Sequence, residues 1–261
     1  MKQVRTRYFD IASCTYGELL SVIETWLIDG HHHYACFCDA NGLAYCRRDH
    51  DLQEAYRMAD AVLADGGVTK ALAWVYGTKL PERVIGPYLF PKAMAYGVER
   101  GWRHFFYGAG PGTAEVLAEK MREQYPGVQI VGTLTPPFGE LSIEQEAEVK
   151  QVIEEAKPDI LWVALGCPRQ EKWTYDQRSK INVPLMLPVG AVFDFYSGHI
   201  PHAPDWVHTL GLRWLWRLLT GGKRTFKRNI WCVPRAALFI FREFFAIRMF
   251  GHIVMKGKKK K

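Results

Sequence analysis

Polar side chains follow a buried apolar run at one point of the chain. Residues 160–163 are apolar and typical of a buried strand, which Gly166 and a proline then break. Arg169, Gln170 and Glu171 open the helix that we expect next. In an open α/β sheet, ligands bind where strands end and helices begin, and the first N–H groups of a helix suit phosphates and hydroxyls. The segment is therefore a candidate ligand site, and a solvated turn is the alternative.

A carboxylate stands at a second expected strand end. Asp65 follows the apolar pair Val62-Leu63 and precedes Gly66-Gly67, where the absence of side chains lets a substrate come close. A carboxylate in such a place can accept a proton. The alternative is a turn residue that caps a helix expected from Val68.

Glycines mark two further turns. Gly108 and Gly110 belong to a G-x-G-x-G run that follows an expected strand and precedes a helix. The spacing differs from the dinucleotide G-x-G-x-x-G pattern and no Walker lysine follows, so hydride transfer is poorly supported. A tight turn and a phosphate contact both remain open. Gly190 lets the backbone approach a ligand near Asp194, whose alternative role is a helix or turn cap.

Strand and helix patterns alternate over most of the chain. Alternation of this kind predicts an α/β fold with a Rossmann-like, mostly parallel sheet flanked by helices. A capping box at Thr15 and Glu18 begins the first helix, and Gly30 is expected to stop it. We expect strands over residues 34–38, 104–107, 128–131, 159–165 and 184–189, and helices over residues 113–124 and 142–155.

The composition changes after residue 198. We therefore expect a catalytic α/β domain over residues 1–198 and a basic, aromatic-rich helical appendage over residues 199–261. The formal net charge is +7, and basic residues crowd the last fifty positions, which indicates an anionic partner. The six cysteines show neither disulfide nor zinc spacing and fit a reducing cytoplasm.

An apolar run over residues 236–255 raises the question of a membrane helix. Arg242, Glu243 and Arg248 lie inside it, and central charges cost ~2.5–3.5 kcal/mol each on insertion. The pattern favours a helix that lies in the membrane interface. A helix packed against its own domain is the alternative.

Several segments together resemble the WecG/TagA/CpsF family of bacterial glycosyltransferases. They occur in family order over roughly residues 10–230 and include "ADAVLADG", "ALGCPRQEKW", "GAVFDF" and "APDW" with "GLRWLWRL". The resemblance implies that Asp65 is the catalytic base. It also implies an inverting displacement that moves a sugar from a UDP-sugar to a polyprenyl-diphosphate-linked acceptor in surface-polysaccharide or cell-wall polymer synthesis. Family donors are of the N-acetylmannosamine, mannosaminuronic acid and glucose types.

The same resemblance assigns the remaining site residues. No Asp-x-Asp pair is present to hold a metal, so cationic side chains would stabilise the departing diphosphate, and we expect a metal-independent enzyme without a cofactor. The arginines that match family positions are Arg83, Arg217, Arg224 and Arg228. The expected substrate-binding residues are Asp39, Asn41, Gly108, Gly110, Gly166, Gln170, Glu171, Gly190 and Asp194. Departures from the family pattern fall at Asp39, Tyr88, His202 and Arg213, and they leave the sugar undecided.

These patterns predict a peripheral enzyme at the cytoplasmic face of the cell membrane. Its partners would be the UDP-sugar, the lipid-linked acceptor and an anionic membrane surface, with no nucleic acid. Assembly into a homo-oligomer is left open. The alternative is a nonenzymatic membrane- or nucleic-acid-binding module on an α/β scaffold, which would have no need of Asp65.

Overall fold

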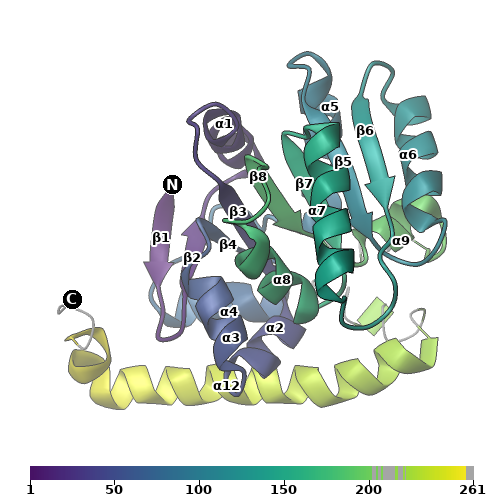
Figure 1. Cartoon of the computed structure of the whole chain (residues 1–261). Helices are drawn as coiled ribbons and strands as arrows, with labels where there is room; N and C mark the ends of the chain where they lie inside the picture. The colour runs from purple at the N-terminus through teal and green to yellow at the C-terminus, as the bar shows by residue number, and fades with distance from the viewer. Residues whose placement is uncertain (202–203, 205–206, 208–214, 217–219, 221, 257–261) are drawn as a thin grey trace.

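The computed structural model describes residues 1–201, 204, 207, 215–216, 220 and 222–256. Within these residues a parallel sheet forms the centre of the molecule (Figure 1). Its spatial order is β4 (Ala61–Ala64), β3 (His33–Cys38), β8 (Leu185–Pro188), β7 (Ile160–Ala164), β5 (Arg103–Gly108) and β6 (Gln129–Leu134). The predicted α/β class is confirmed, and each predicted strand corresponds to one of these.

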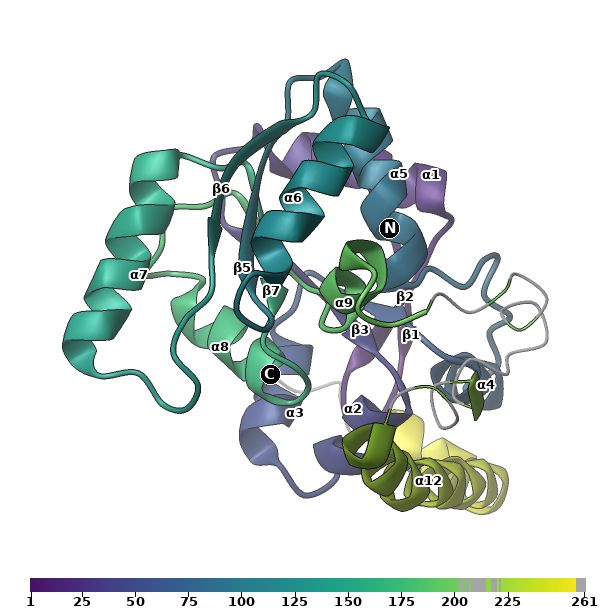
Figure 2. The ribbon, with the colours of Figure 1, turned by 90° about the vertical axis from the view of Figure 1, so that its right-hand side faces the viewer.

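Helices cover both faces of the sheet. The first face carries α1 (Tyr16–Trp26), α5 (Gly86–Val98), α6 (Thr113–Gln124) and α9 (Val192–Ser197). The second carries α2 (Ala40–Cys46), α3 (His50–Arg57), α4 (Gly67–Val75), α7 (Ile143–Ala156) and α8 (Arg169–Gln177). Figure 2 shows α6 and α9 on one side of the sheet, with α7 and α8 on the other.

Burial on both faces explains why the strand sequences are continuously apolar. All five residues of β7 are buried, because one set of side chains packs under α5 and the other under α7. Trp162 in β7 lies against Phe90 at 4.9 Å between ring centroids and donates a hydrogen bond to His104 at 3.1 Å. The middle of the sheet is therefore a buried core that is apolar apart from the paired His104.

The predicted capping box at Thr15 is confirmed, and the structure adds a second one. Thr15 and Glu18 form the capping box of α1, and Ser142 forms another with Gln145 at α7. The end of α1 differs from the prediction: the helix stops at Trp26, four residues before Gly30. A side-chain turn replaces the last helical turn, because Asp29 accepts hydrogen bonds from the backbone of His31 and the ring of His33.

One long helix, α12 (Gly222–Lys256), closes the described chain. The apolar pattern predicts a helix only over residues 236–255. In the structure the helix already begins at Gly222 and continues through Pro234. Helix α12 runs beneath α2 and α4 along one side of the domain (Figure 1). No helix of the described residues is long and apolar enough to cross a membrane.

A short antiparallel hairpin, which the sequence did not reveal, holds the far part of α12. Strands β1 (Lys2–Arg5) and β2 (Asp10–Ser13) pair with each other at the N-terminus. The turn between them carries Tyr8, which packs on Phe239 at 5.4 Å, and Arg7, which lies 3.8 Å from Glu243. Helix α12 is thus joined to α2, to α4 and to the N-terminal hairpin. The predicted boundary at residue 198 stays a prediction.

Candidate active site

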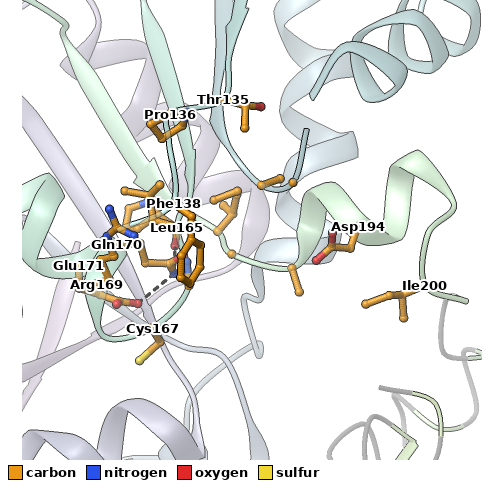
Figure 3. A pocket seen from close by; sticks show the side chains of 18 of the residues that line it. Thr135, Pro136, Phe138, Leu165, Cys167, Arg169, Gln170, Glu171, Asp194 and Ile200 are labelled. Carbon is orange, nitrogen blue, oxygen red and sulfur yellow. Dashed lines mark hydrogen bonds between the residues drawn. The ribbon is translucent and has the colours of Figure 1, made fainter. Parts of the chain in front are cut away.

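A cavity of about 960 Å³ lies at the carboxyl edge of the parallel sheet. The turns that follow β3, β4, β5, β6, β7 and β8 all contribute to its wall, as do the start of α9 and one turn of α12. Figure 3 shows part of this wall, with Gln170 and Glu171 on one side and Asp194 on the other. Of the predicted site residues, the cavity is lined by Asp39, Asn41, Asp65, Gly110, Gly166, Gln170, Glu171, Gly190, Asp194 and Arg228.

The topology explains why the cavity forms at this place. Strands β5 and β7 are neighbours, but the chain leaves β5 towards β6 and leaves β7 towards β8, in opposite directions. The helices that follow, α6 and α8, lie on opposite faces of the sheet. Such a switch point opens a crevice at the strand ends, and this is where doubly wound α/β proteins bind their ligands.

Two helices begin at the crevice without a side-chain cap. The N-cap of α6 is Gly112 and that of α8 is Pro168, and neither gives a side-chain hydrogen bond to the helix start. Helices α1, α2, α3 and α7, by contrast, all have side-chain caps. The backbone N–H groups of Thr113 and Gln170 donate to the carbonyls of Gly110 and Gly166 at 3.0 and 2.9 Å. The helix starts carry no side-chain cap beyond these bonds, and with the helix dipole they favour an anion such as phosphate.

Two carboxylates follow neighbouring strands at the β4 end of the cavity. Cys38 and Ala64 are register partners, so Asp39 and Asp65 come directly after paired residues. The backbone N–H of Asp65 donates to the carbonyl of Cys38 at 3.1 Å, which extends the pairing by one residue. Helix α4 has Gly66 as its N-cap and no side-chain cap. Asp65 therefore does not cap that helix, as the local pattern allowed, and its half-buried carboxyl lines the cavity.

Asp39 positions its neighbour Asn41. One carboxyl oxygen of Asp39 accepts hydrogen bonds from the backbone N–H groups of Asn41 and Gly42 at 2.8 and 3.0 Å and so caps α2. The other oxygen accepts from the side-chain amide of Asn41 at 2.7 Å. This fixes the amide, whose own oxygen Oδ1 is buried and has no hydrogen-bond partner among the described residues. Asn41 thus presents an acceptor to whatever fills the cavity.

Gln170 is held at the opposite wall by three hydrogen bonds. Its carbonyl accepts from the backbone N–H of Gly166 at 3.0 Å, and its amide donates to Glu171 at 3.0 Å and to the carbonyl of Pro188 at 3.3 Å. A Cβ at Gly190 would lie 3.1 Å from the Gln170 carbonyl oxygen, so glycine there makes room for this network. Gln170 joins the ends of β7 and β8 into one rigid surface.

Glu171 is a fully buried carboxyl in the same wall. Its Oε1 accepts from Gln170, while Oε2 has no well-formed hydrogen bond from any described residue. The pKa of Glu171 is raised to about 7. Burial is the main cause and the nearby charge of Asp39 adds to it, while hydrogen bonds from its own backbone N–H, from Gln170 and from Cys167 oppose it. Glu171 is therefore poised to hold or release a proton near neutral pH.

One arginine of α12 reaches the cavity. Arg228 is half-buried and lines the wall together with Thr225, and its Nε is buried with no hydrogen-bond partner within the described residues. A guanidinium with an unused donor next to an anion-favouring crevice is suited to phosphate. Arg224 belongs to the same helix, but its side chain is outside the described part of the structure. Arg217 lies outside the described residues. His202 and Arg213, two departures from the family pattern, are also outside it.

Two predicted residues are not brought to the cavity wall. Gly108 ends β5 with φ +106°, and a Cβ there would lie 2.7 Å from the carbonyl oxygen of Ala164, so glycine serves the close approach of β5 and β7. Arg83 lies between α4 and α5, where its carbonyl accepts a hydrogen bond from Tyr16 at 3.1 Å. Neither residue is part of the lining.

The wall also includes a segment that the sequence patterns did not assign to the site. Residues 133–138, at and after the end of β6, line the cavity, and so does Arg169 at the start of α8. The signal in the sequence was a pair of prolines and a phenylalanine directly after a strand. Among the described residues, no group of three or more His, Cys, Asp or Glu side chains is arranged to hold a metal ion.

Comparisons with known proteins show the family of this chain. A family model described as "Glycosyl transferase WecG/TagA/CpsF family" matches residues 5–249. An N-acetylglucosaminyldiphosphoundecaprenol N-acetyl-beta-D-mannosaminyltransferase of Bacillus subtilis is 27% identical over 75% of this chain and 74% of its own length. An enzyme of the same name from Bacillus spizizenii is 30% identical over 68% of this chain and 66% of its own length. Because the family model spans nearly the whole sequence, this chain belongs to the WecG/TagA/CpsF family of glycosyltransferases.

Proposed function

We propose that this enzyme transfers N-acetylmannosamine from a UDP-linked donor to N-acetylglucosamine on a polyprenyl diphosphate, with inversion at the anomeric carbon. The names of the two Bacillus relatives supply the sugar and the acceptor class. The observation that carries the proposal is one cavity that joins the Asp65 carboxyl, the Arg228 guanidinium and the uncapped starts of α6 and α8. A base, a cation and an anion-favouring crevice are the parts that transfer from a sugar diphosphate requires.

The reaction on these residues is a single displacement. The Asp65 carboxylate accepts the proton of an acceptor hydroxyl, and the freed oxygen attacks the anomeric carbon of the donor. A new carbon–oxygen bond forms as the bond to the β-phosphate breaks, and UDP leaves with the electron pair. Arg228 and the N–H groups at the starts of α6 and α8 stabilise the negative charge that develops on the diphosphate. No metal ion takes part in this scheme.

Asp65 separates this proposal from the nonenzymatic alternative. Asp65→Asn keeps the size and polarity of the side chain, but the amide no longer takes a proton. We expect turnover to fall by ~10²–10⁴-fold while the affinity for UDP stays unchanged. Turnover is measured as UDP release with a lipid-linked acceptor, and UDP affinity by calorimetry. Wild-type turnover by the mutant at full occupancy would remove Asp65 from the mechanism.

The exposed side of α12 supports membrane binding. Its inner side packs on the domain through Cys232, Ala236 and Phe239. This contact agrees with the alternative given for residues 236–255, a helix packed against its own domain. Its outer side carries apolar side chains three or four residues apart, except for the eight-residue step from Ile230 to Leu238, and we call them the apolar stripe. The stripe consists of Phe226, Ile230, Leu238, Phe241, Phe245 and Met249, each 44–69% exposed.

An anionic membrane is the occupant that best fits this surface. Exposed Lys227, Arg235, Arg242 and Arg248 flank the apolar stripe, and four lysines end the chain. Apolar residues between basic ones suit a helix that lies in the headgroup region of a bilayer. Arg228 on the same helix lines the cavity, so the stripe would hold the cavity close to a lipid-linked substrate. We accordingly propose a peripheral enzyme at the cytoplasmic face.

A further inference from the structure

Phe138 is the most exposed large apolar side chain of the described residues, at 93%. It belongs to the β6–α7 loop, residues 135–142, and it lines the cavity together with Pro136 and Pro137. Figure 3 shows its ring on the side of the cavity where Leu165 and Gln170 lie. An aromatic ring left in solvent at the mouth of a polar cavity gains nothing for the fold, and this makes a role in ligand contact the natural explanation.

The β6–α7 loop is fixed at both ends of the aromatic segment. The hydroxyl of Thr135 donates to the carbonyl of Gly108 at 3.2 Å. On the other side, the guanidinium of Arg169 donates to the carbonyl of Gly139, whose φ of +116° favours glycine. The two prolines between these points restrict the backbone further. Phe138 is thus carried on a loop already ordered for binding, which lowers the entropy lost when a ligand is held.

The position of the loop in the sheet indicates which part of a ligand it meets. Asp65 follows β4 at one edge of the sheet, and Phe138 follows β6 at the other edge, five strand spacings or roughly 24 Å away. The acceptor hydroxyl and the reacting carbon must lie at Asp65. The part of a nucleotide-sugar farthest from its reacting carbon is the base, which therefore extends towards β6.

We infer that Phe138 is a nucleobase-binding residue, which stacks on the uracil ring of the donor and thereby fixes the donor in the crevice between β5 and β7. The inference rests on the proposed nucleotide-sugar donor. At this end of the wall, apolar side chains lie beside Thr133, Thr135 and Arg169; the apolar ones are Leu134, Pro136, Pro137, Phe138 and Leu165. An apolar surface suits the flat face of a base and does not suit a diphosphate, which belongs at the helix starts.

The test compares Phe138→Ala with wild type by calorimetry, with UDP, UMP and inorganic pyrophosphate as separate ligands. Loss of stacking on one base should weaken UDP and UMP about tenfold and leave pyrophosphate unchanged. Phe138→Trp should keep wild-type affinity, and Phe138→Leu should behave as the alanine variant, because a leucine is apolar but has no ring to stack. Ile143→Ala, at an 84% exposed site outside the cavity, is the matched control.

The outcomes separate this inference from the function on which it rests. If the wild-type protein binds no uridine nucleotide, the proposed donor and the stacking role both fall. If UDP binds the wild type and Phe138→Ala equally well, only the stacking role falls. Equal weakening of pyrophosphate would mean that the mutation deforms the loop, and this also overturns the inference. A raised KM for the acceptor with unchanged UDP affinity would assign Phe138 to the acceptor sugar instead.

Discussion

At neutral pH the buried charge of Glu171 should lower the free energy of unfolding. Replacing Glu171 by glutamine should remove this destabilising effect. The pKa of Glu171 is raised from its ordinary 4.5 to about 7, because the side chain is fully buried. The folded protein therefore binds a proton more tightly than the unfolded chain does. Stability from this group is fully present below pH 4.5 and is lost as the pH rises through 7. At 1.36 kcal/mol per pKa unit, the whole loss is roughly 3 kcal/mol.

Urea unfolding of wild type and Glu171→Gln at pH 5, 6, 7 and 8 measures this loss. The wild-type free energy of unfolding should fall relative to that of the mutant across this range, and the difference should level off above pH 7. Taking the difference cancels other titrating groups, such as His104, whose burial lowers its pKa to about 3. Glu119→Gln, at an exposed position of α6, serves as the control for a glutamate replaced outside the core. Parallel pH profiles for wild type and Glu171→Gln would refute the reasoning, because they would show that the Glu171 charge is not desolvated by folding.

Three further predictions concern the charges and the membrane. Activity should survive EDTA, because Arg228 and helix N–H groups stabilise the leaving UDP in place of a metal; recovery of a chelated enzyme only on adding Mg²⁺ or Mn²⁺ would contradict this. Arg228→Ala should lower kcat by ~10²–10³-fold, as for the loss of one charge-stabilising donor, and Arg228→Lys should restore part of it. Arg235→Ala is the control for Arg228, since Arg235 lies on the same helix, stacks on Trp231 and is outside the cavity wall. The double change Phe241→Ser and Phe245→Ser should weaken binding to anionic liposomes, and salt should weaken what remains, because each basic residue near the surface contributes ~1 kcal/mol within a Debye length. The control for this double variant is Ile28→Ser, at an 83% exposed site far from α12 in sequence. If the double variant binds liposomes as well as the Ile28→Ser control does, the membrane contact lies elsewhere.

The periodicity of the sequence predicted most of the α/β core. Parallel strands buried on both faces give unbroken apolar runs, and the helices between them give a helical period, so both were visible without a structure. The hairpin β1–β2 escaped prediction because its strands are only four residues long and β1 is mostly exposed. The sequence does not show the start of α12, because two adjacent glycines favour a flexible link, whereas in the structure Gly222, with φ +70°, is the first residue of the helix.

The site was predictable where its residues follow strand ends. Asp39 and Asp65 come directly after apolar runs, and Gln170 lies at the start of the helix after β7. Parallel strands bring such positions to one edge of a sheet. Gly108 was assigned to the ligand because the sequence does not show the close contact of β5 with β7, which is a tertiary feature. The reverse held for Phe138: only the structure shows that its ring is exposed at the cavity and that Arg169 holds its loop in place.

The most direct test of the account is a transfer assay with purified enzyme, a short-chain polyprenyl-diphosphate N-acetylglucosamine and a panel of UDP-sugars. UDP release and the mass of the lipid product are followed together, and the anomeric configuration of the new linkage is read by NMR. The account predicts that UDP-N-acetylmannosamine gives a disaccharide lipid with inverted configuration and that Asp65→Asn gives almost none. Retention of configuration, or no acceptor-dependent UDP release from any UDP-sugar in the panel, would contradict it.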